Sequence, residues 1–424
     1  MKWTDEVVTP SALESVVEAC VQDTPVIDIH THLHPPSFGN LLLWGIDELV
    51  TYHYLVAELF RSSDATPAEF WRLSKSQQAD LIWDALFVKN TPFSAAAAGV
   101  VAVMVKLGLD PRQPNLKQAR EYFASATIDQ HLAKVRELAH VSELVMTNDP
   151  FNAAERACWE RNEPCPDWFH RALRMDPVLR DWPAAQAVMA AAGFRVSADP
   201  DPLSIKEARR FLDQWIARLR PAYLAVSLPY TFVYPDDSLR TRLIREIVLP
   251  TCCEQDVPFA MMIGPSYQVN PELKDAGDSV GSADTHSVER LCAENPDVRF
   301  LVTLLARENQ HALCVSARKF SNLMPFGCWW FLNNPSIVEE MSRQRFELLG
   351  STVIPQHSDA RILDQLIYKW LHSRRTIAHA LTASYARLQA DGYTLTRAQI
   401  ARDVERLFSG NFRKWAKLPA PATA

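Results

Sequence analysis

Short apolar runs alternate with amphipathic stretches over the last two thirds of the chain, from about Val141 onward. The apolar runs, each short enough for a strand, are SELVMTN, PAYLAVSLP, PFAMMIG, VRFLVTLL, NLMPFGCWWF and STVIPQHS. Helix-like patterns lie between them, such as SIKEARRFLDQWIARLR, SLRTRLIREIVLPTCCEQ and NPSIVEEMSRQRFELLG. A strand followed by a helix, repeated many times, predicts a parallel sheet with crossover helices. The number of units favours an α/β fold of the (β/α)8 TIM-barrel type over an open doubly wound sheet.

The first third of the chain has a different pattern. Residues 26–33 are apolar and β-branched, and they predict a buried strand. Beyond them lie long helical patterns such as PAEFWRLSKSQQADLIWDALF. We therefore expect one domain over residues 1–424, with a mainly helical insertion at 40–140. No Gly-rich phosphate loop follows the first strand, which argues against a dinucleotide-binding fold.

Composition and charge exclude several classes of function. The 424 residues carry a formal net charge of −6, with a pI near 6.1, whereas a nucleic-acid-binding surface needs clustered Lys and Arg. No apolar run approaches the roughly 20 residues of a membrane span, and the acidic N-terminal segment lacks the apolar stretch of a signal peptide. The eight cysteines are dispersed without a CxxC pair, as expected of reduced thiols in a cytoplasmic protein.

Three histidines end the first predicted strand, in the stretch VIDIHTHLHPP. Because side chains alternate along a strand, His30 and His32 project side by side from its C-terminal end, where barrel enzymes carry their catalytic groups. Two neutral imidazoles in this arrangement are typical ligands of one divalent cation; the alternative is a pair of solvent-facing loop histidines. His34 precedes Pro35-Pro36, where the strand must end, and we expect it behind the ligands or in the pocket wall.

A carboxylate from another strand is the natural third ligand, and STVIPQHSDAR supplies one. Asp359 is able to bind the metal and to take a proton from a metal-bound hydroxyl or water. Arg361, two residues further on, is able to hold a substrate carboxylate through two parallel hydrogen bonds. The competing interpretation is that Ser358 and Asp359 cap the helix that follows in ILDQLIYKWL.

These residues and further blocks resemble the amidohydrolase superfamily and, within it, the uronate (glucuronate) isomerase family. The blocks occur in the family's order over most of the chain: VIDIHTHLHP, HYLVAELFR, VMTNDP, ALRMDP, FGCWWFLNNP, SDAR and FSGNFRKW. Each block alone is a weak signal, but the ordered set is specific.

The resemblance implies a distorted (β/α)8 barrel that holds one divalent metal ion, usually Zn2+, on His30, His32 and Asp359. Family members interconvert an aldo-uronate and a keto-uronate by moving a proton between C1 and C2. The residues that the resemblance assigns to the sugar acid are Tyr54, Arg174, Arg361 and a tryptophan of the pair Trp329-Trp330.

Two positions depart from the family's pattern. In MMIGPSY, Met262 stands where the family has an active-site histidine, and Tyr267 stands where it has an arginine. A thioether sulfur is neither an acid nor a base at neutral pH, so we expect the proton-transfer groups to differ from the family's. His357, at a position that is typically apolar in the family, and His286 are the imidazoles that we expect as replacements in the pocket.

Some of these residues also have ordinary structural explanations. On an alternating strand, one ring of the pair Trp329-Trp330 faces the barrel and the other faces the surrounding helices. Without the resemblance, Arg174 is a surface arginine in a turn and Tyr54 is a core tyrosine.

The leading hypothesis is a metal-dependent aldose–ketose isomerase of a uronate or a related acidic sugar, such as glucuronate or galacturonate. The alternative is a hydrolase or lyase of a carboxylated substrate that uses metal-activated water, and a third hypothesis is a binding protein with a vestigial metal site. We expect a small-molecule substrate, no nucleic acid and no membrane as partners, and assembly as a homo-oligomer.

Overall fold

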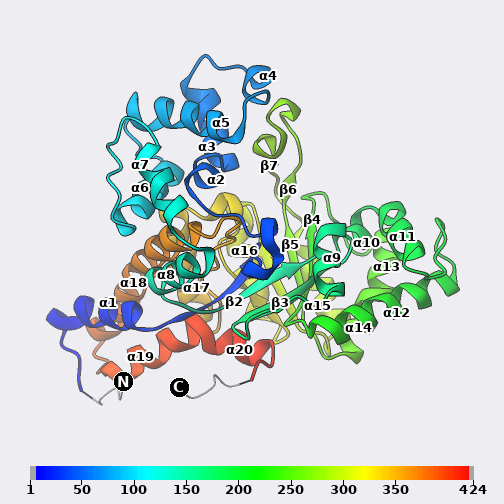
Figure 1. Ribbon diagram of the computed structural model, residues 1–424. Helices are drawn as coiled ribbons and strands as arrows, with labels where there is room; N and C mark the ends of the chain where they lie inside the picture. Colours follow the sequence, from blue (N-terminus) through cyan, green and yellow to red (C-terminus); the bar gives the residue numbers. More distant parts are fainter. Residues whose placement is uncertain (1–5, 420–424) are drawn as a thin grey trace.

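A curled parallel sheet forms the centre of the computed structural model, which describes residues 6–419 (Figure 1). Residues 1–5 and 420–424 of the predicted domain lie outside this range. Within it, the sheet has seven strands in the order β1-β2-β3-β4-β5-β8-β9, all parallel. The strands are β1 (Val26–Thr31), β2 (Val141–Asn148), β3 (Phe169–Arg174), β4 (Leu224–Leu228), β5 (Phe259–Ile263), β8 (Phe300–Leu304) and β9 (Leu323–Pro325). The predicted α/β barrel fold is confirmed.

Residues 351–362, here called the barrel-closing segment, connect the two edges of the sheet. On one side, Gly327 N donates to Ile354 O (2.9 Å) and Ile354 N donates to Pro325 O (3.3 Å). On the other side, the segment is hydrogen-bonded to the backbone at the end of β1. The prediction that STVIPQHS forms a strand is wrong: Ile354 forms only an isolated bridge with Phe326, and Pro355, which follows it, has no N–H to donate. Just beyond this stretch, Asp359 has a positive φ of 51°. This irregular segment completes the distorted barrel.

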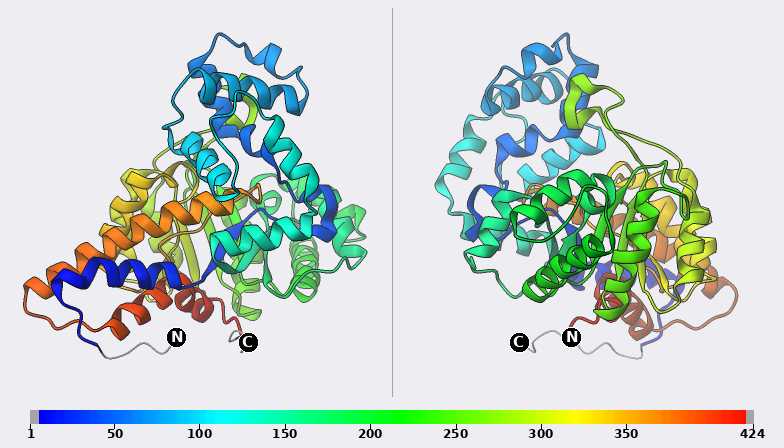
Figure 2. Two further views of the ribbon diagram at one scale, coloured as in Figure 1. Left: turned by 60° about the vertical axis from the view of Figure 1, so that its left-hand side comes forward. Right: turned by 90° about the vertical axis from the view of Figure 1, so that its right-hand side faces the viewer.

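Helices surround the sheet, as the amphipathic patterns predict, and two views show them on its outer face (Figure 2). Apolar side chains from both the sheet and α20 (Asn411–Trp415) fill the barrel's interior, and Phe412 packs there with Ile27, Ile29 and Tyr223. The surrounding helices are α1 (Leu13–Asp23), α9 (Ala153–Glu160), α10 (Asp176–Arg180), α11 (Trp182–Ala191), α12 (Pro202–Leu219), α13 (Leu239–Leu243), α14 (Leu249–Glu254), α15 (Thr285–Glu294), α16 (Gln310–Ala317), α17 (Pro335–Leu349), α18 (Gln365–Ala390) and α19 (Arg397–Glu405).

A helical layer between β1 and β2 lies over one end of the sheet (Figures 1 and 2). Thr66, Ser74 and Thr127 start helices of this layer with reciprocal capping boxes, which satisfy free N–H groups at the helix ends. The helices are α2 (Ile46–Val50), α3 (His53–Ser62), α4 (Pro67–Phe70), α5 (Lys75–Trp83), α6 (Ala95–Lys106), α7 (Lys117–Ser125) and α8 (Ile128–Ala139).

A hairpin after β5 contacts this helical layer. It consists of β6 (Pro265–Ser266), the 3-10 turns η5 (Pro271–Gly277) and β7 (Ser279–Val280), and its two strands pair antiparallel. Trp71 Nε1 donates to Glu272 O (2.8 Å), and the ammonium of Lys274 lies 4.2 Å from the centroid of the Trp71 ring. Two segments that are distant in sequence thus form one wall above the end of the sheet.

The strand predicted in NLMPFGCWWF ends early, and β3 was not predicted. Gly327 and Trp330 have positive φ values of 62° and 47°, so the chain leaves the sheet after Pro325 and Trp330 begins a 3-10 turn. Half of the residues of β3, whose sequence is FHRALR, are polar, so it lacks the apolar run that marks the other strands.

The cysteines and the helices were compared with two expectations from the sequence, reduced thiols and no membrane span. All eight cysteines lie within the described residues and none forms a disulfide. Across residues 6–419, no helix combines the length and the apolar character that crossing a membrane requires.

A buried hydrogen-bonded pair joins the helical layer to the barrel. His131 Nε2 in α8 lies 2.7 Å from Asp364 Oδ1, and both side chains are 0% exposed. The second oxygen of Asp364 accepts a hydrogen bond from Gly45 N (2.9 Å), just before α2.

We expect Asp364→Ala to lower the free energy of unfolding by about 3–5 kcal/mol, because it leaves a buried imidazole and a buried N–H without their partner. Glu121→Ala is the control: it removes an ion pair with Lys117 whose side chains are 66% and 81% exposed, and we expect a change below about 1 kcal/mol. Chemical denaturation followed by circular dichroism measures both. Similar small losses would contradict a stabilising role for the buried pair.

Candidate metal centre and active-site cavity

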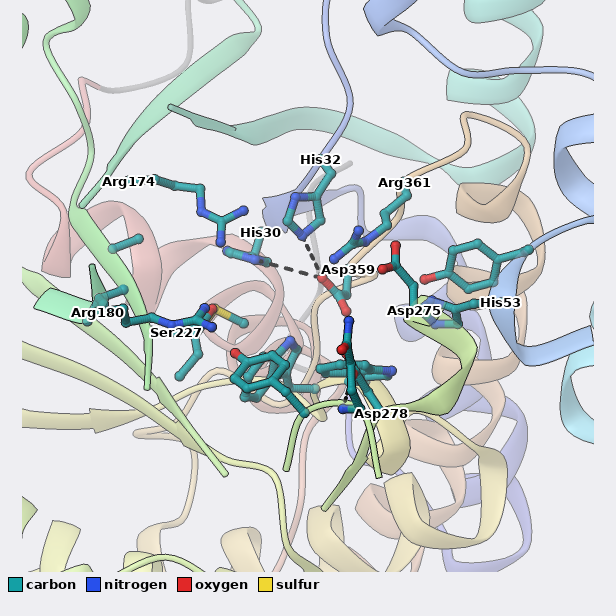
Figure 3. A pocket seen from close by; sticks show the side chains of 18 residues that line it. His30, His32, His53, Arg174, Arg180, Ser227, Asp275, Asp278, Asp359 and Arg361 are labelled. Atoms are coloured by element: carbon teal, nitrogen blue, oxygen red, sulfur yellow. Dashed lines mark hydrogen bonds and ion pairs between the residues drawn. The ribbon is translucent and has the colours of Figure 1, made fainter. Parts of the chain in front are cut away.

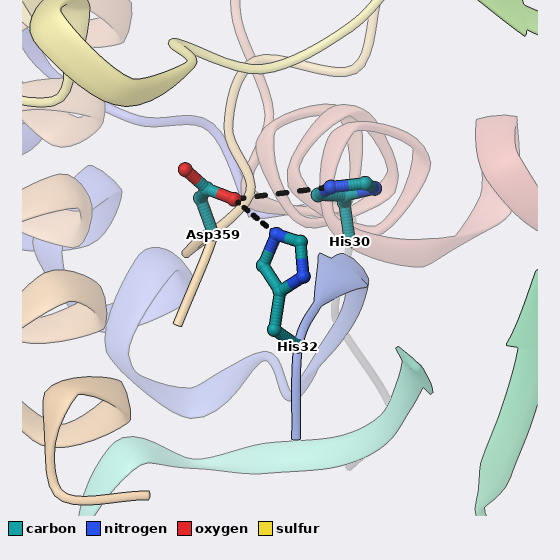
Figure 4. A group of neighbouring side chains, drawn as sticks. All are labelled: His30, His32 and Asp359. Carbon is teal, nitrogen blue, oxygen red and sulfur yellow. Dashed lines mark ion pairs between the residues drawn. The ribbon is translucent and has the colours of Figure 1, made fainter. Parts of the chain in front are cut away.

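The structure brings His30, His32 and Asp359 together at the C-terminal end of β1 (Figure 4). Asp359 Oδ1 lies 3.8 Å from His30 Nε2 and 3.3 Å from His32 Nε2. One ligand atom from each of the three residues lies within 4.8 Å of the other two. Such a set of two imidazoles and a carboxylate is typical of a site for one divalent cation.

Backbone contacts hold the carboxylate opposite the histidines. Asp359 N donates to His30 O (3.1 Å), and His32 N donates to Ala360 O (2.8 Å). Lys369, buried in α18, donates from Nζ to Ser358 O (2.6 Å). Asp359 keeps its left-handed backbone conformation between these contacts, since the barrel-closing segment is held from β1 on one side and from α18 on the other.

The electrostatic environment keeps each group in the protonation state that a metal ligand needs. Burial lowers the pKa of His30 to about 3 and that of His32 to about 4. Burial alone would raise the pKa of Asp359, but His32, when its ring is protonated, and the ammonium group of Lys369 hold this pKa well below its usual range. Two neutral imidazoles and one carboxylate are therefore present at neutral pH.

The donor set fits a divalent metal ion on geometric grounds as well. Asp359 Oδ1 is buried and accepts no hydrogen bond from the described part of the chain. A buried carboxylate oxygen without a donor is costly, because it has lost water without gaining a partner. A cation bound among Asp359, His30 and His32 would remove this cost.

A cavity of about 470 Å³ opens beside the cluster (Figure 3). It lies between the end of the sheet, the helical layer and the hairpin. Its lining residues are His30, His32, Tyr52, His53, Arg174, Arg180, Ala225, Val226, Ser227, Met262, Tyr267, Gln268, Asp275, Asp278, Trp329, Trp330, Asp359 and Arg361. The positive groups in this lining are Arg174, Arg180 and Arg361. Together with a cation in the metal cluster, they suit the cavity to an anionic molecule.

Asp176 orders two arginines on one side of this cavity. Arg174 Nε donates to Asp176 Oδ2 (2.9 Å), and Arg180 lies 3.6 Å from Asp176 Oδ1, which also accepts from Ser227 N (3.1 Å). Burial alone would raise the pKa of Asp176, but Arg174 holds it below its usual range. The guanidinium of Arg180 lies 4.4 Å from the centroid of the Tyr267 ring on the hairpin, an arrangement that favours a cation over an aromatic face.

Arg361 lines the cavity on the other side. Its backbone N–H donates to Gln365 Oε1 (2.9 Å), and Figure 3 shows its guanidinium near His32 and Asp275. The structure thus places Arg174 and Arg361, both predicted from the sequence, in the same cavity as the metal cluster.

The tryptophan pair differs from the prediction of one ring in the barrel and one against the helices. Both Trp329 and Trp330 line the cavity, because the positive φ of Trp330 breaks the alternation of a strand. Tyr54, in contrast, is absent from this lining; it borders an adjacent cavity of about 260 Å³ together with Trp330 and Phe331.

His357 is in the barrel but not in the cavity wall. It is fully buried, its ring centroid lies 5.4 Å from that of His30, and neither ring nitrogen has a hydrogen-bond partner among the described residues. Gly327 makes room for it, because a Cβ at Gly327 would lie 1.6 Å from His357 Nδ1. Met262 lines the cavity on β5, so the structure does not put His357 in its place.

The two remaining histidines also lie away from the cavity wall. His34 stacks on Phe38 at a ring distance of 5.6 Å. The expectation that His286 faces the pocket is wrong: its side chain is 74% exposed on α15 and pairs with Glu289 (2.8 Å).

The structure also adds cavity residues that the sequence patterns did not single out. Tyr52 and His53 precede Tyr54 in the block HYLVAELFR and its flank, and His53 Nε2 is buried without a partner among the described residues. Burial lowers the pKa of His53 to about 3. Arg180 follows the block ALRMDP by one helical turn, and this spacing is the signal that could have identified it.

The structure was compared with solved structures. A uronate isomerase from Bacillus halodurans C-125 matches with 49% sequence identity and a TM-score of 0.95, over 97% of this chain and 98% of that chain. The chain belongs to the uronate isomerase family. The resemblance seen in the separated sequence blocks is thereby confirmed.

More distant members of the uronate isomerase family share the fold. The uronate isomerase from Thermotoga maritima has a TM-score of 0.75 at 13% identity and covers 98% of this chain and 99% of its own. The glucuronate isomerase from Caulobacter crescentus has a TM-score of 0.75 at 15% identity and covers 100% of this chain and 98% of its own. No protein-family model and no curated protein sequence matches the chain.

Gly327 and Gly350 provide a matched test of the packing around His357. Both have a positive φ, 62° and 60°, but a Cβ at Gly350 would have no neighbour within 4 Å. Gly350 has a ψ of −132°, outside the left-handed helical region. We expect Gly350→Ala to lower the free energy of unfolding by about 1–3 kcal/mol through backbone strain. We expect a several-fold larger loss for Gly327→Ala, because the methyl group also displaces His357. Thermal and chemical denaturation measure both, and equal losses would contradict the close packing.

Proposed function

We propose that the protein is a metal-dependent aldose–ketose isomerase of uronates such as glucuronate and galacturonate, which moves a proton between C1 and C2. The observation that carries this proposal is the joining of the metal cluster and three arginines in one cavity, within a chain of the uronate isomerase family. A uronate needs both features, since its reacting oxygens lie at C1 and C2 and its carboxylate lies at the other end of the sugar.

His30, His32 and Asp359 would hold one divalent cation, and we propose zinc. Three protein ligands of this kind with an open position are typical of catalytic zinc sites. When bound, the cation supplies positive charge that stabilises the negative charge developing on the oxygens at C1 and C2.

Arginines hold the substrate in this proposal. A planar guanidinium binds a carboxylate through two parallel hydrogen bonds, and Arg174, Arg180 and Arg361 all face the cavity. Asp176 fixes the orientation of Arg174, so little entropy is lost when the substrate binds. Trp329 and Trp330 give an apolar wall against which the C–H face of a sugar packs.

Proton transfer is assigned to groups that reach the cavity. Asp359 is the carboxylate beside the two histidines and accepts a proton from a substrate hydroxyl. His53 lines the cavity and its Nε2 is buried without a partner among the described residues, so this nitrogen is available to exchange a proton with the sugar. Tyr54 and His357 have no part in this assignment, because neither lines the cavity.

Localisation and assembly complete the proposal. Eight unpaired thiols are typical of a protein that functions in the cytoplasm. We also propose a homo-oligomer, for which light scattering gives the mass in solution.

We expect the purified protein with zinc to convert glucuronate or galacturonate to the corresponding ketose and to exchange deuterium at C2 in deuterated water. Nuclear magnetic resonance follows both signals. A chelator is expected to stop the reaction and added zinc to restore it. Asp359→Asn is expected to abolish turnover while the circular dichroism spectrum is unchanged. Absence of both ketose and C2 exchange would contradict the substrate class, and cleavage of a carboxylated substrate instead would favour the hydrolase or lyase alternative.

Arg361→Met and Arg174→Met are each expected to lower kcat/KM for the uronate by about 10- to 100-fold, because each removes charged hydrogen bonds to the substrate. Arg343→Met is the control, since Arg343 pairs with Glu339 on α17 (2.7 Å) and does not line the cavity. Steady-state kinetics over a range of uronate concentrations measures the effect. Unchanged kcat/KM in both cavity variants would contradict arginine binding of the carboxylate.

A further inference from the structure

Each of the two histidines of the metal cluster has a hydroxyl group behind it. His30 Nδ1 lies 3.0 Å from the hydroxyl oxygen of Tyr223, and His32 Nδ1 lies 3.1 Å from Oγ1 of Thr147. Thr147 belongs to β2, and Tyr223 directly precedes β4. The histidines lie at the end of β1, so residues on or next to two other strands of the sheet supply these contacts.

Each hydroxyl uses its own hydrogen in another bond. The Tyr223 hydroxyl donates to Ile29 O (2.7 Å), and the Thr147 hydroxyl donates to Thr31 O (3.1 Å). The pairing of β1 with β2 shifts its register between Asp28 and Thr31, and the Ile29 carbonyl lies in this irregular interval.

The direction of these bonds determines which nitrogen of each imidazole carries the hydrogen. A hydroxyl has one hydrogen to donate, and in both cases a β1 carbonyl receives it. Each oxygen is therefore left to accept a hydrogen bond, and the donor has to be the Nδ1–H of the histidine. With the hydrogen on Nδ1, the lone pair of the neutral ring is on Nε2.

Both Nε2 atoms face Asp359. Three electron-pair donors, the two Nε2 atoms and Asp359 Oδ1, therefore lie together without a hydrogen between them. The Nε2 atoms of His30 and His32, which carry the lone pairs, lie 3.8 Å and 3.3 Å from Asp359 Oδ1. No hydrogen is left among the three atoms, and the atoms repel one another unless a cation lies between them.

We propose that Tyr223 and Thr147 are positioning residues: by accepting from Nδ1, they hold His30 and His32 in the tautomer whose Nε2 binds the cation. The hydrogen-bond partner of a ligand histidine also fixes the orientation of its ring and increases its basicity. Tyr223 is suited to this because it is 1% exposed and its ring stacks on His30 at 6.5 Å. The role concerns the site itself and holds whichever substrate the enzyme acts on.

The test is the affinity for zinc, measured by competition with a chromogenic chelator. Tyr223→Phe and Thr147→Val preserve the side-chain shape but lose the hydroxyl, and each is expected to weaken zinc binding by about 10- to 100-fold. Thr147→Ser keeps the hydroxyl and is expected to bind zinc nearly as tightly as the wild-type protein. If Thr147→Val and Tyr223→Phe both bind zinc like the wild type, or if Thr147→Ser is as weak as Thr147→Val, the proposal is wrong.

A second readout separates the tautomer from simple loss of packing. In protein labelled with 15N-histidine, nitrogen resonances show which ring nitrogen carries the hydrogen, and substitution of His30 or His32 assigns the signals. We expect both histidines as Nδ1–H in the wild-type protein without metal, and a loss of this form at His32 in Thr147→Val. Circular dichroism monitors folding. If Tyr223→Phe fails to fold, the comparison of Thr147→Val with Thr147→Ser still tests the proposal. An Nε2–H tautomer of His30 or His32 in the wild-type protein would refute it.

Discussion

The hydrogen bonds between β1 and the barrel-closing segment are the constraint on which the rest of this structure depends. Asp28 in β1 accepts from Ser358 N (3.0 Å) with one oxygen and from Trp370 Nε1 in α18 (2.8 Å) with the other. A fully buried carboxylate is stable only when donors surround it, so Asp28 requires both partners to be in place. The same contacts set Asp359 opposite His30. The contacts that close the barrel are therefore the same contacts that position the metal cluster.

The cavity above this closure combines a rigid floor with walls from elsewhere in the chain. The floor consists of strand ends, where buried neighbours fix the side chains. The walls come from the helical layer and the hairpin, which are joined through Trp71. The side chains that these two segments contribute to the cavity wall are polar or charged, as expected where loops carry binding groups on a rigid scaffold. The division explains why His30, His32 and Asp359 lie on the barrel while part of the cavity wall comes from the two added segments.

The departures at Met262 and Tyr267 have a structural context. Met262 lines the cavity from β5 with an apolar side chain, and Tyr267 lies under the guanidinium of Arg180. Positive charge is thus present beside Tyr267 although the residue itself is neutral. Cation and aromatic ring stabilise one another, which joins the hairpin to α10 at the edge of the cavity.

The sequence by itself determined the fold class, the family and the three residues that the structure brings together as the candidate metal cluster. Alternating apolar and amphipathic segments require burial of each strand and of one face of each helix, and this pattern is local. His30 and His32 were predictable because strand alternation places them on one face, and Asp359 because a carboxylate was needed from the far end of the chain.

Tertiary structure alone decided the rest. The barrel-closing segment is not a strand, both tryptophans face the cavity, and His286 lies on the surface, because positive φ angles and packing override alternation. The cavity lining that includes Arg180 and His53 and leaves out His357 depends on contacts between segments far apart in the sequence. No local pattern encodes such contacts, and only the packed chain shows the hydroxyl groups of Tyr223 and Thr147 behind the two histidines.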